Sequence, residues 1–287
     1  MKNINYIKVN AKDGAVIPVV TFNIEDAEKK GVVIISHGFG EHADSYIEFA
    51  EFLWKGNYAS VIIDQRGHGK PPEGAKRWHG QIQDYECFVD DIVSVTAEVK
   101  KMAPDTPIAL YGHSMGGNII ANTLLKIPPE QVKEYSCAIL ESPWFELTPP
   151  LSPTTRSLVR FLSKVMPKFR IHRKLNHEKI SSDEVKNKTY SADPYYHGFI
   201  SVRMLDGIMN ACDYALGNAE KLPVKTYLAY ASNEVIVSNK EMIEFAEKAG
   251  DIVTLKKYES NHAIHNDINQ VPYCEDIIAF LDANLSK

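Results

Sequence analysis

Short apolar runs rich in β-branched residues alternate along this chain with longer segments whose apolar residues recur at helical spacing. The central runs are apolar at almost every position, which is typical of strands buried on both faces of a parallel sheet. This alternation predicts an α/β fold with a mostly parallel sheet, helices on both faces, and a site outside the carboxyl ends of the strands. Strands are expected at 5–9, 15–22, 32–36, 59–64, 108–111, 137–141, 224–229 and 253–258, and helices at 45–55, 86–102, 115–126, 240–248 and 273–285.

The segment 143–197 breaks the alternation, because it holds proline-rich turns and no clear strand. We therefore expect one α/β core, residues 1–142 and 198–287, with 143–197 inserted as a helical cap. Within the cap, residues 158–166 place apolar side chains at helical spacing around two cations. These side chains either pack on the sheet or line a pocket for an apolar substrate, with Leu158, Phe161 and Leu162 as candidate binding residues.

Composition and charge narrow the class of protein. The chain has 287 residues, of which 44% are hydrophobic and 24% charged, and this excludes disordered, collagen-like and coiled-coil proteins. The net charge of −5 argues against nucleic-acid binding. The four cysteines have neither metal-ligand nor disulfide-framework spacing, and no apolar run reaches the roughly 20 residues that span a bilayer. We expect a soluble, cytoplasmic protein of a reducing compartment.

The strongest chemical signal is the G-x-S-x-G pattern around Ser114, between a predicted strand and a predicted helix. Such a nucleophile elbow needs small residues two positions before and after the serine, because the turn is too tight for side chains. The alternative is an ordinary tight turn with a helix-capping serine. The glycine-flanked Phe39, after the strand at 32–36, and Met115, after the serine, are the expected backbone N–H donors of an oxyanion hole.

A general base and an acid are expected after the later strands. His262 is the first histidine after the last strand and is the candidate base, with His265 as the alternative. Glu234 is the only carboxylate in the loop after the strand at 224–229 and is the candidate acid, with Asp251 in reserve.

Two further clusters predict structural roles. The segment 64–69 contains Asp, Arg and His together with two glycines, which favours a loop fixed by an ion pair and glycine turns over a catalytic role. Glu41 and His42 suggest a metal site, but no second pair of ligands follows at suitable spacing. We therefore expect no metal and no cofactor.

Taken in order, the motifs resemble those of the monoacylglycerol lipase/lysophospholipase group of α/β-hydrolases, over almost the whole chain. The matching stretches are 37–42, 64–69, 112–117, 141–144, 193–194 and 261–265. The resemblance implies Ser114 as nucleophile, His262 as base, Phe39 and Met115 as oxyanion donors, and a helical cap; Trp144 and Val237 are added as candidate substrate-binding residues. The chain departs from the family where Ala231 and Glu234 replace the usual glycine and aspartate, and Phe39 replaces a residue that is often small.

These observations predict a serine carboxylester hydrolase for monoacylglycerols, lysophospholipids or short acyl esters, working through an acyl-enzyme. Transient contact of the cap with a membrane surface is a further expectation. An aryl or feruloyl esterase, a thioesterase or a peptidase would use the same groups, because fold alone does not separate these chemistries. A catalytically silent member that only binds a ligand is the alternative from a different class.

Overall fold

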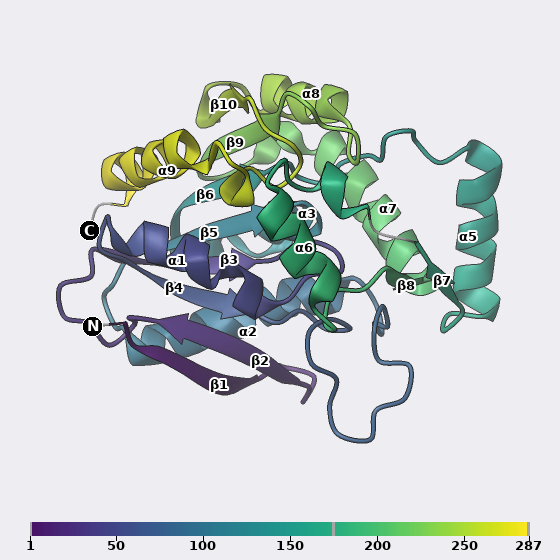
Figure 1. Ribbon diagram of the computed structural model, residues 1–287, viewed down its shortest axis with the longest axis horizontal. Helices are drawn as coiled ribbons and strands as arrows, with labels where there is room; N and C mark the ends of the chain where they lie inside the picture. Colours follow the sequence, from purple (N-terminus) through teal and green to yellow (C-terminus); the bar gives the residue numbers. More distant parts are fainter. Residues whose placement is uncertain (1, 174–175, 286–287) are drawn as a thin grey trace.

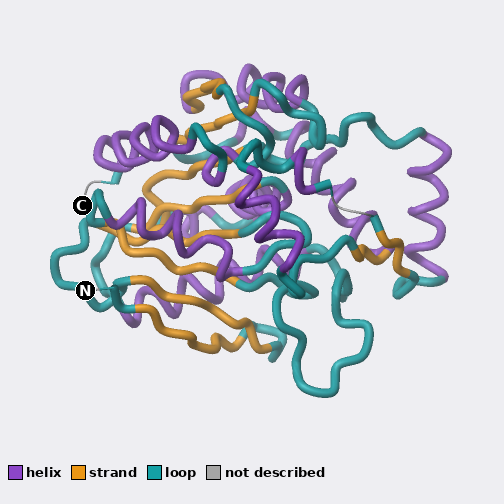
Figure 2. The backbone as a smooth tube through the Cα atoms, in the orientation of Figure 1, coloured by secondary structure: helices purple, strands orange, loops and turns teal. Residues whose placement is uncertain are grey.

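The computed structural model describes residues 2–173 and 176–285, and these form an eight-stranded sheet with helices on both faces (Figures 1 and 2). The strand order is β1-β2-β4-β3-β5-β6-β9-β10. The first three strands in this order pair antiparallel and all later neighbours pair parallel. The predicted fold class is confirmed. The strands are β1 (Ile4–Asn10), β2 (Val16–Phe22), β3 (Gly31–Ser36), β4 (Tyr58–Ile63), β5 (Ile108–His113), β6 (Tyr135–Glu141), β9 (Lys225–Ala231) and β10 (Val253–Tyr258).

The sheet separates two hydrophobic cores, because its central strands are apolar on both faces. One core packs under α2, α3, α7 and α8, and the other packs under α1 and α9. The helices are α1 (Ile47–Trp54), α2 (Glu86–Met102), α3 (Met115–Lys126), α4 (Pro129–Val132), α5 (Pro153–Val165), α6 (Glu184–Ala192), α7 (Val202–Gly217), α8 (Asn239–Ala249) and α9 (Gln270–Asn284). Single-turn 3₁₀ helices occur at η1 (Ala43–Tyr46), η2 (His177–Lys179), η3 (Ala219–Lys221), η4 (Gly250–Ile252) and η5 (Ile264–Asn266). No helix among the described residues has the length and apolar character that crossing a membrane requires.

The sequence pattern predicted the connection between β6 and β9 less well than the rest of the fold. It contains α5, α6, α7 and a two-stranded antiparallel sheet of β7 (Arg170–His172) and β8 (Phe199–Ser201). The sequence predicted neither the short strands nor α7. Helix α5 lies at one end of the molecule and packs against α7, which also packs against α3 (Figure 1). The assignment of 143–197 as a cap stays a prediction.

The turn from β5 into α3 depends on close backbone approaches. A Cβ atom built on Gly116 would lie 2.0 Å from the Ser36 carbonyl oxygen, and one on Gly112 would lie 2.3 Å from the Gly116 carbonyl oxygen. Both atoms belong to buried main chain, one at the end of β3 and one in the first turn of α3, so neither contact can be relieved by rotating a side chain. Only glycine fits these two positions.

We therefore expect Gly116→Ala to lower the free energy of unfolding by about 3 kcal/mol or more, because β3 and α3 must separate. Gly217→Ala is the matched control, since a Cβ on Gly217 meets nothing within 4 Å. Urea denaturation followed by circular dichroism measures both. Equal stability of the two variants would contradict the described packing of the turn.

Candidate active site

Ser114 stands at the turn between β5 and α3 with a left-handed backbone, φ 53° and ψ −115°. Its amide donates to the Glu141 carbonyl at 2.9 Å, and its own carbonyl accepts from the Trp144 amide at 2.9 Å. A non-glycine residue at positive φ is strained and persists where its surroundings hold it. The last residue of β6 and the segment that follows it therefore hold the serine backbone at both its amide and its carbonyl.

Two amide groups near this turn lack acceptors. Met115 is the first residue of α3, and Phe39 lies in the turn after β3. Within residues 2–173 and 176–285, neither amide donates a hydrogen bond. Because β3 and β5 are parallel neighbours, with Ser36 paired to Gly112, both turns leave the same edge of the sheet. Unpaired N–H groups at this edge are suited to bind a negatively charged oxygen.

The structure brings Glu234 and His262 together. Oε2 of Glu234 lies 2.6 Å from Nδ1 of His262, and both side chains are buried. A carboxylate only accepts, so Nδ1 carries the proton and Nε2 is left for another partner. Oε1 of Glu234 accepts from the amides of Ile236 at 2.8 Å and Val237 at 3.3 Å. The glutamate is thus held at one oxygen by its own loop and presents the other to the imidazole.

Charge and burial act in opposite directions on this pair. Burial disfavours the His262 imidazolium, but the charge and hydrogen bond of Glu234, with the charges of Glu41 and Glu141, together outweigh burial and raise the pKa of His262. Burial likewise opposes the Glu234 carboxylate, but the charge and hydrogen bond of His262 and two backbone amides hold the pKa of Glu234 below its usual value. Among the described residues, the Ser114 hydroxyl forms no hydrogen bond with His262. Such bonds are often long in a ligand-free enzyme.

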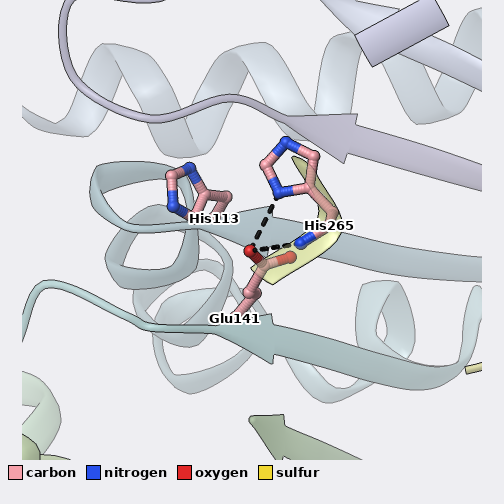
Figure 3. A group of neighbouring side chains, drawn as sticks. All are labelled: His113, Glu141 and His265. Carbon is pink, nitrogen blue, oxygen red and sulfur yellow. Dashed lines mark hydrogen bonds and ion pairs between the residues drawn. The ribbon is translucent and has the colours of Figure 1, made fainter. Parts of the chain in front are cut away.

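His265, the alternative base, has a different carboxylate. Oε1 of Glu141 accepts from Nδ1 of His265 at 2.8 Å and from the His265 amide at 3.2 Å (Figure 3). Oε2 of Glu141 accepts from the Tyr111 hydroxyl. Burial raises the pKa of Glu141, but the charges of His265 and His113 outweigh burial and bring it to about 2. The side chains of His113, Glu141 and His265 each offer one possible metal-ligand atom, and these three atoms lie within 4.8 Å of one another. Both Glu141 oxygens, however, already accept hydrogen bonds from protein groups.

The sequence indicates Glu141 only as part of the motif at 141–144 and does not predict its role. The available signal was a carboxylate directly after the apolar run 137–140 at the end of a buried strand, since such a group requires hydrogen-bond donors. Its backbone carbonyl holds the Ser114 amide and its side chain holds the loop that carries both histidines. Glu141 therefore joins the turn of the predicted nucleophile to the loop of the predicted base.

The reserve acid Asp251 lies away from the predicted base. Asp251 precedes β10 and His262 follows β10, so the two residues lie at opposite ends of this strand. The segment 64–69 has the structural role that was predicted for it, because the Arg66 guanidinium binds Asp91 and Asp13. His42, considered above as a metal ligand, pairs with Asp193 of the predicted cap, with Nε2 of His42 lying 2.8 Å from Oδ2 of Asp193.

The candidate substrate-binding residues fall into two groups. Trp144 and Val237 are buried, and the Trp144 ring meets the Phe39 ring edge-on at 6.3 Å. Leu158 and Phe161 lie on α5 and are 55% and 60% exposed, while Leu162 is half-buried. The structure does not bring these α5 residues to Ser114, and their role in substrate binding stays a prediction.

Comparisons with known proteins place the chain among serine hydrolases. The family model described as serine aminopeptidase, S33, matches residues 27–269. The monoacylglycerol lipase of Mycolicibacterium smegmatis is 27% identical in an alignment of 270 residues that covers 91% of each chain. The monoglyceride lipase of Rattus norvegicus is 27% identical over 84% of this chain and 78% of its own length.

Solved structures share the fold. A soluble variant of the Saccharomyces cerevisiae monoglyceride lipase, in complex with a substrate analogue, superposes with a TM-score of 0.85 at 23% identity, covering 100% of this chain and 96% of that chain. A thermostable carboxyl esterase from Bacillus coagulans, in complex with glycerol, gives a TM-score of 0.82 at 19% identity and covers 99% of both chains. These likenesses establish the α/β-hydrolase fold.

The Glu234–His262 contact makes a prediction that needs no substrate. Glu234→Gln should lower the pKa of His262 by about one to three pH units, because it removes the charge that offsets burial. Asp251→Asn, at the opposite edge of the sheet, should leave that pKa unchanged. Titration of the His262 ring by NMR measures both variants. An unchanged pKa in Glu234→Gln would show that another group stabilises the imidazolium.

Proposed function

Because the chain belongs to the serine aminopeptidase S33 family and is a serine hydrolase of the α/β-hydrolase superfamily, we propose that it hydrolyses carboxylic esters through a Ser114–His262–Glu234 triad. The observation that carries the proposal is the buried Glu234–His262 hydrogen bond, found at the same edge of the sheet as the strained Ser114 turn. A tight elbow alone occurs in many proteins, whereas an oriented imidazole beside it is needed to activate a serine.

In the proposed reaction, Nε2 of His262 accepts the Ser114 proton as Oγ attacks the ester carbonyl. The Phe39 and Met115 amides bind the oxyanion, and each donor contributes about 3 kcal/mol of transition-state stabilisation. The imidazolium then protonates the leaving alcohol, and the acyl group stays on Ser114. Water, deprotonated by His262, attacks this acyl-enzyme and releases the acid. Glu234 keeps the proton on Nδ1 throughout and stabilises the imidazolium.

We propose monoacylglycerols, lysophospholipids or short acyl esters as the substrate class. The bacterial and mammalian relatives named as monoacylglycerol and monoglyceride lipases support this class. The Phe39 ring is enclosed by edge-on contacts with Trp144, His68 and His197, which hold it in place beside the predicted oxyanion donor. A fixed ring there favours short, unbranched acyl groups over branched ones. The description of the family favours a peptidase as the second candidate.

We further propose that 143–197 is a cap whose outer face meets the lipid surface on which such substrates occur. Helix α5 exposes Leu158, Phe161 and Val165, each more than half exposed, beside the cations Arg160 and Lys164. Apolar residues flanked by cations are suited to a shallow, reversible contact with lipid headgroups. The amide of His197, which donates to the Gly40 carbonyl at 3.0 Å, ties the end of this segment to the turn that carries Phe39.

The triad is tested with p-nitrophenyl esters, monoacylglycerols, lysophospholipids, feruloyl esters, acyl thioesters and aminoacyl p-nitroanilides. Ser114→Ala should abolish turnover without changing the melting temperature, and His262→Ala should lower kcat by about a thousandfold or more. His265→Ala should lose much less catalysis, although its lost bond to Glu141 should lower stability. Full activity of Ser114→Ala would refute the triad, and a preference for anilides would favour the peptidase.

The lipid-facing role of α5 is tested by replacing Leu158, Phe161 and Val165 with serine. Hydrolysis of monoacylglycerol in phospholipid vesicles should fall by about tenfold or more, because apolar area is lost from the contact. Hydrolysis of dissolved p-nitrophenyl acetate should not change. A matched variant replaces, also with serine, Leu255, Ile268 and Val271, which are exposed as well but lie outside 143–197. Equal losses in the two triple variants would refute a specific role for α5.

A further inference from the structure

A cavity of about 1060 Å³ lies between the start of β2, the loop 64–83 and the residues that follow α5. In Figure 1 this loop is the long blue segment that extends below β7 and β8, beside the start of β2. The lining includes none of Ser114, His262, Glu234, Phe39 or Met115. The cavity is therefore distinct from the catalytic groups proposed above, and its volume is ample for a small ligand.

Cations gather around this cavity in a chain whose net charge is −5. Six of its lining residues are lysine or arginine, and Asp64 is the one carboxylate among the lining residues. Arg66 is neutralised by Asp91 and Asp13. Within the described part of the chain, the other five have no ion pair: Lys70, Lys76, Arg77, Lys168 and Arg203.

Two further observations indicate positive charge without a counter-ion. Burial and the nearby charge of Arg77 lower the pKa of Arg170, which follows the cavity residue Lys168 by two positions. Arg203 donates from one terminal nitrogen to the Gln83 carbonyl at 2.9 Å and from the other to the Ser163 carbonyl, but its buried Nε has no partner. The Arg203 guanidinium is thus held by two backbone carbonyls and by no carboxylate among the described residues.

The rest of the lining is largely apolar. Val16, Ile17, Trp78, Ile82 and Pro167 contribute to it, and Val16 is 53% exposed. An anion alone would gain nothing from these side chains, and a hydrocarbon alone would gain nothing from the five unpaired cations. A ligand that carries both parts fits the lining better than either part by itself.

We propose that this cavity binds an amphiphilic anion, a carboxylate or phosphate attached to a hydrocarbon chain. The acid released by ester hydrolysis belongs to this class, but the site is inferred from its own lining and does not depend on the proposed function. One side chain separates an occupant from the Phe39 turn, because His68 lines the cavity and its ring meets the Phe39 ring edge-on at 5.8 Å.

Isothermal titration calorimetry of the whole protein tests the proposal with dodecanoate and dodecyl phosphate, below their micelle concentrations. Inorganic phosphate and the neutral dodecyl glycerol ether serve as the two half-ligands. The cavity variant replaces Lys76, Arg77 and Lys168 with glutamine. The control variant replaces Lys133, Lys188 and Lys257, which are exposed, lack ion pairs among the described residues, and change the net charge equally.

Each amphiphilic anion should bind the control variant as tightly as it binds the wild type. It should bind the cavity variant about tenfold more weakly. Each half-ligand should bind the wild type more weakly than the amphiphiles. Equal affinity of the cavity and control variants, or equal affinity of inorganic and dodecyl phosphate for the wild type, would overturn the proposal. Binding should also change tryptophan fluorescence in Trp54→Phe but not in Trp78→Phe, and a signal that survives in Trp78→Phe would place the ligand elsewhere.

Discussion

The left-handed backbone of Ser114 is the constraint on which the arrangement of the site depends. Strain of this kind costs about 1 to 3 kcal/mol and is kept only where the surroundings determine the conformation. Here the Glu141 carbonyl fixes the serine amide, and the contact of Gly116 with the Ser36 carbonyl leaves no space for a side chain. The same close approach of β3, β5 and α3 places the turns of Phe39 and Met115 at one edge of the sheet.

Two buried histidine–glutamate pairs, His262–Glu234 and His265–Glu141, differ in what else their carboxylates bind. Glu234 has one oxygen on its own loop amides and offers the other to His262, so a longer side chain than the family's usual aspartate still reaches the imidazole. Glu141 uses one oxygen for the amide and ring of His265 and the other for Tyr111. The Glu141 oxygens therefore join three separate segments of the chain, whereas the Glu234 oxygens bind only the loop of Glu234 itself and His262, the proposed base.

Much of the fold could be predicted from the sequence, because its central strands are continuous apolar runs and its core helices are regularly amphipathic. The helices at 86–102 and 115–126 and the strand at 253–258 were predicted with the observed bounds. Helix α7 was missed because Gly207 is a poor helix former in the middle of its sequence pattern. Only packing explains that glycine, since a Cβ there would lie 2.8 Å from the Tyr85 Cβ. Strands β7 and β8 are three residues each, too short to show a period.

The pairing of Glu234 with His262 followed from the order of motifs along the chain, whereas the role of Glu141 and the cationic cavity depend on contacts between distant segments. Mass spectrometry after treatment with an alkyl fluorophosphonate tests the central claim most directly, because only an activated serine is phosphonylated rapidly. One adduct should form, map to Ser114, and be lost in His262→Ala while His265→Ala still reacts. A folded wild-type chain that forms no adduct, or forms it on another serine, would contradict the proposed site.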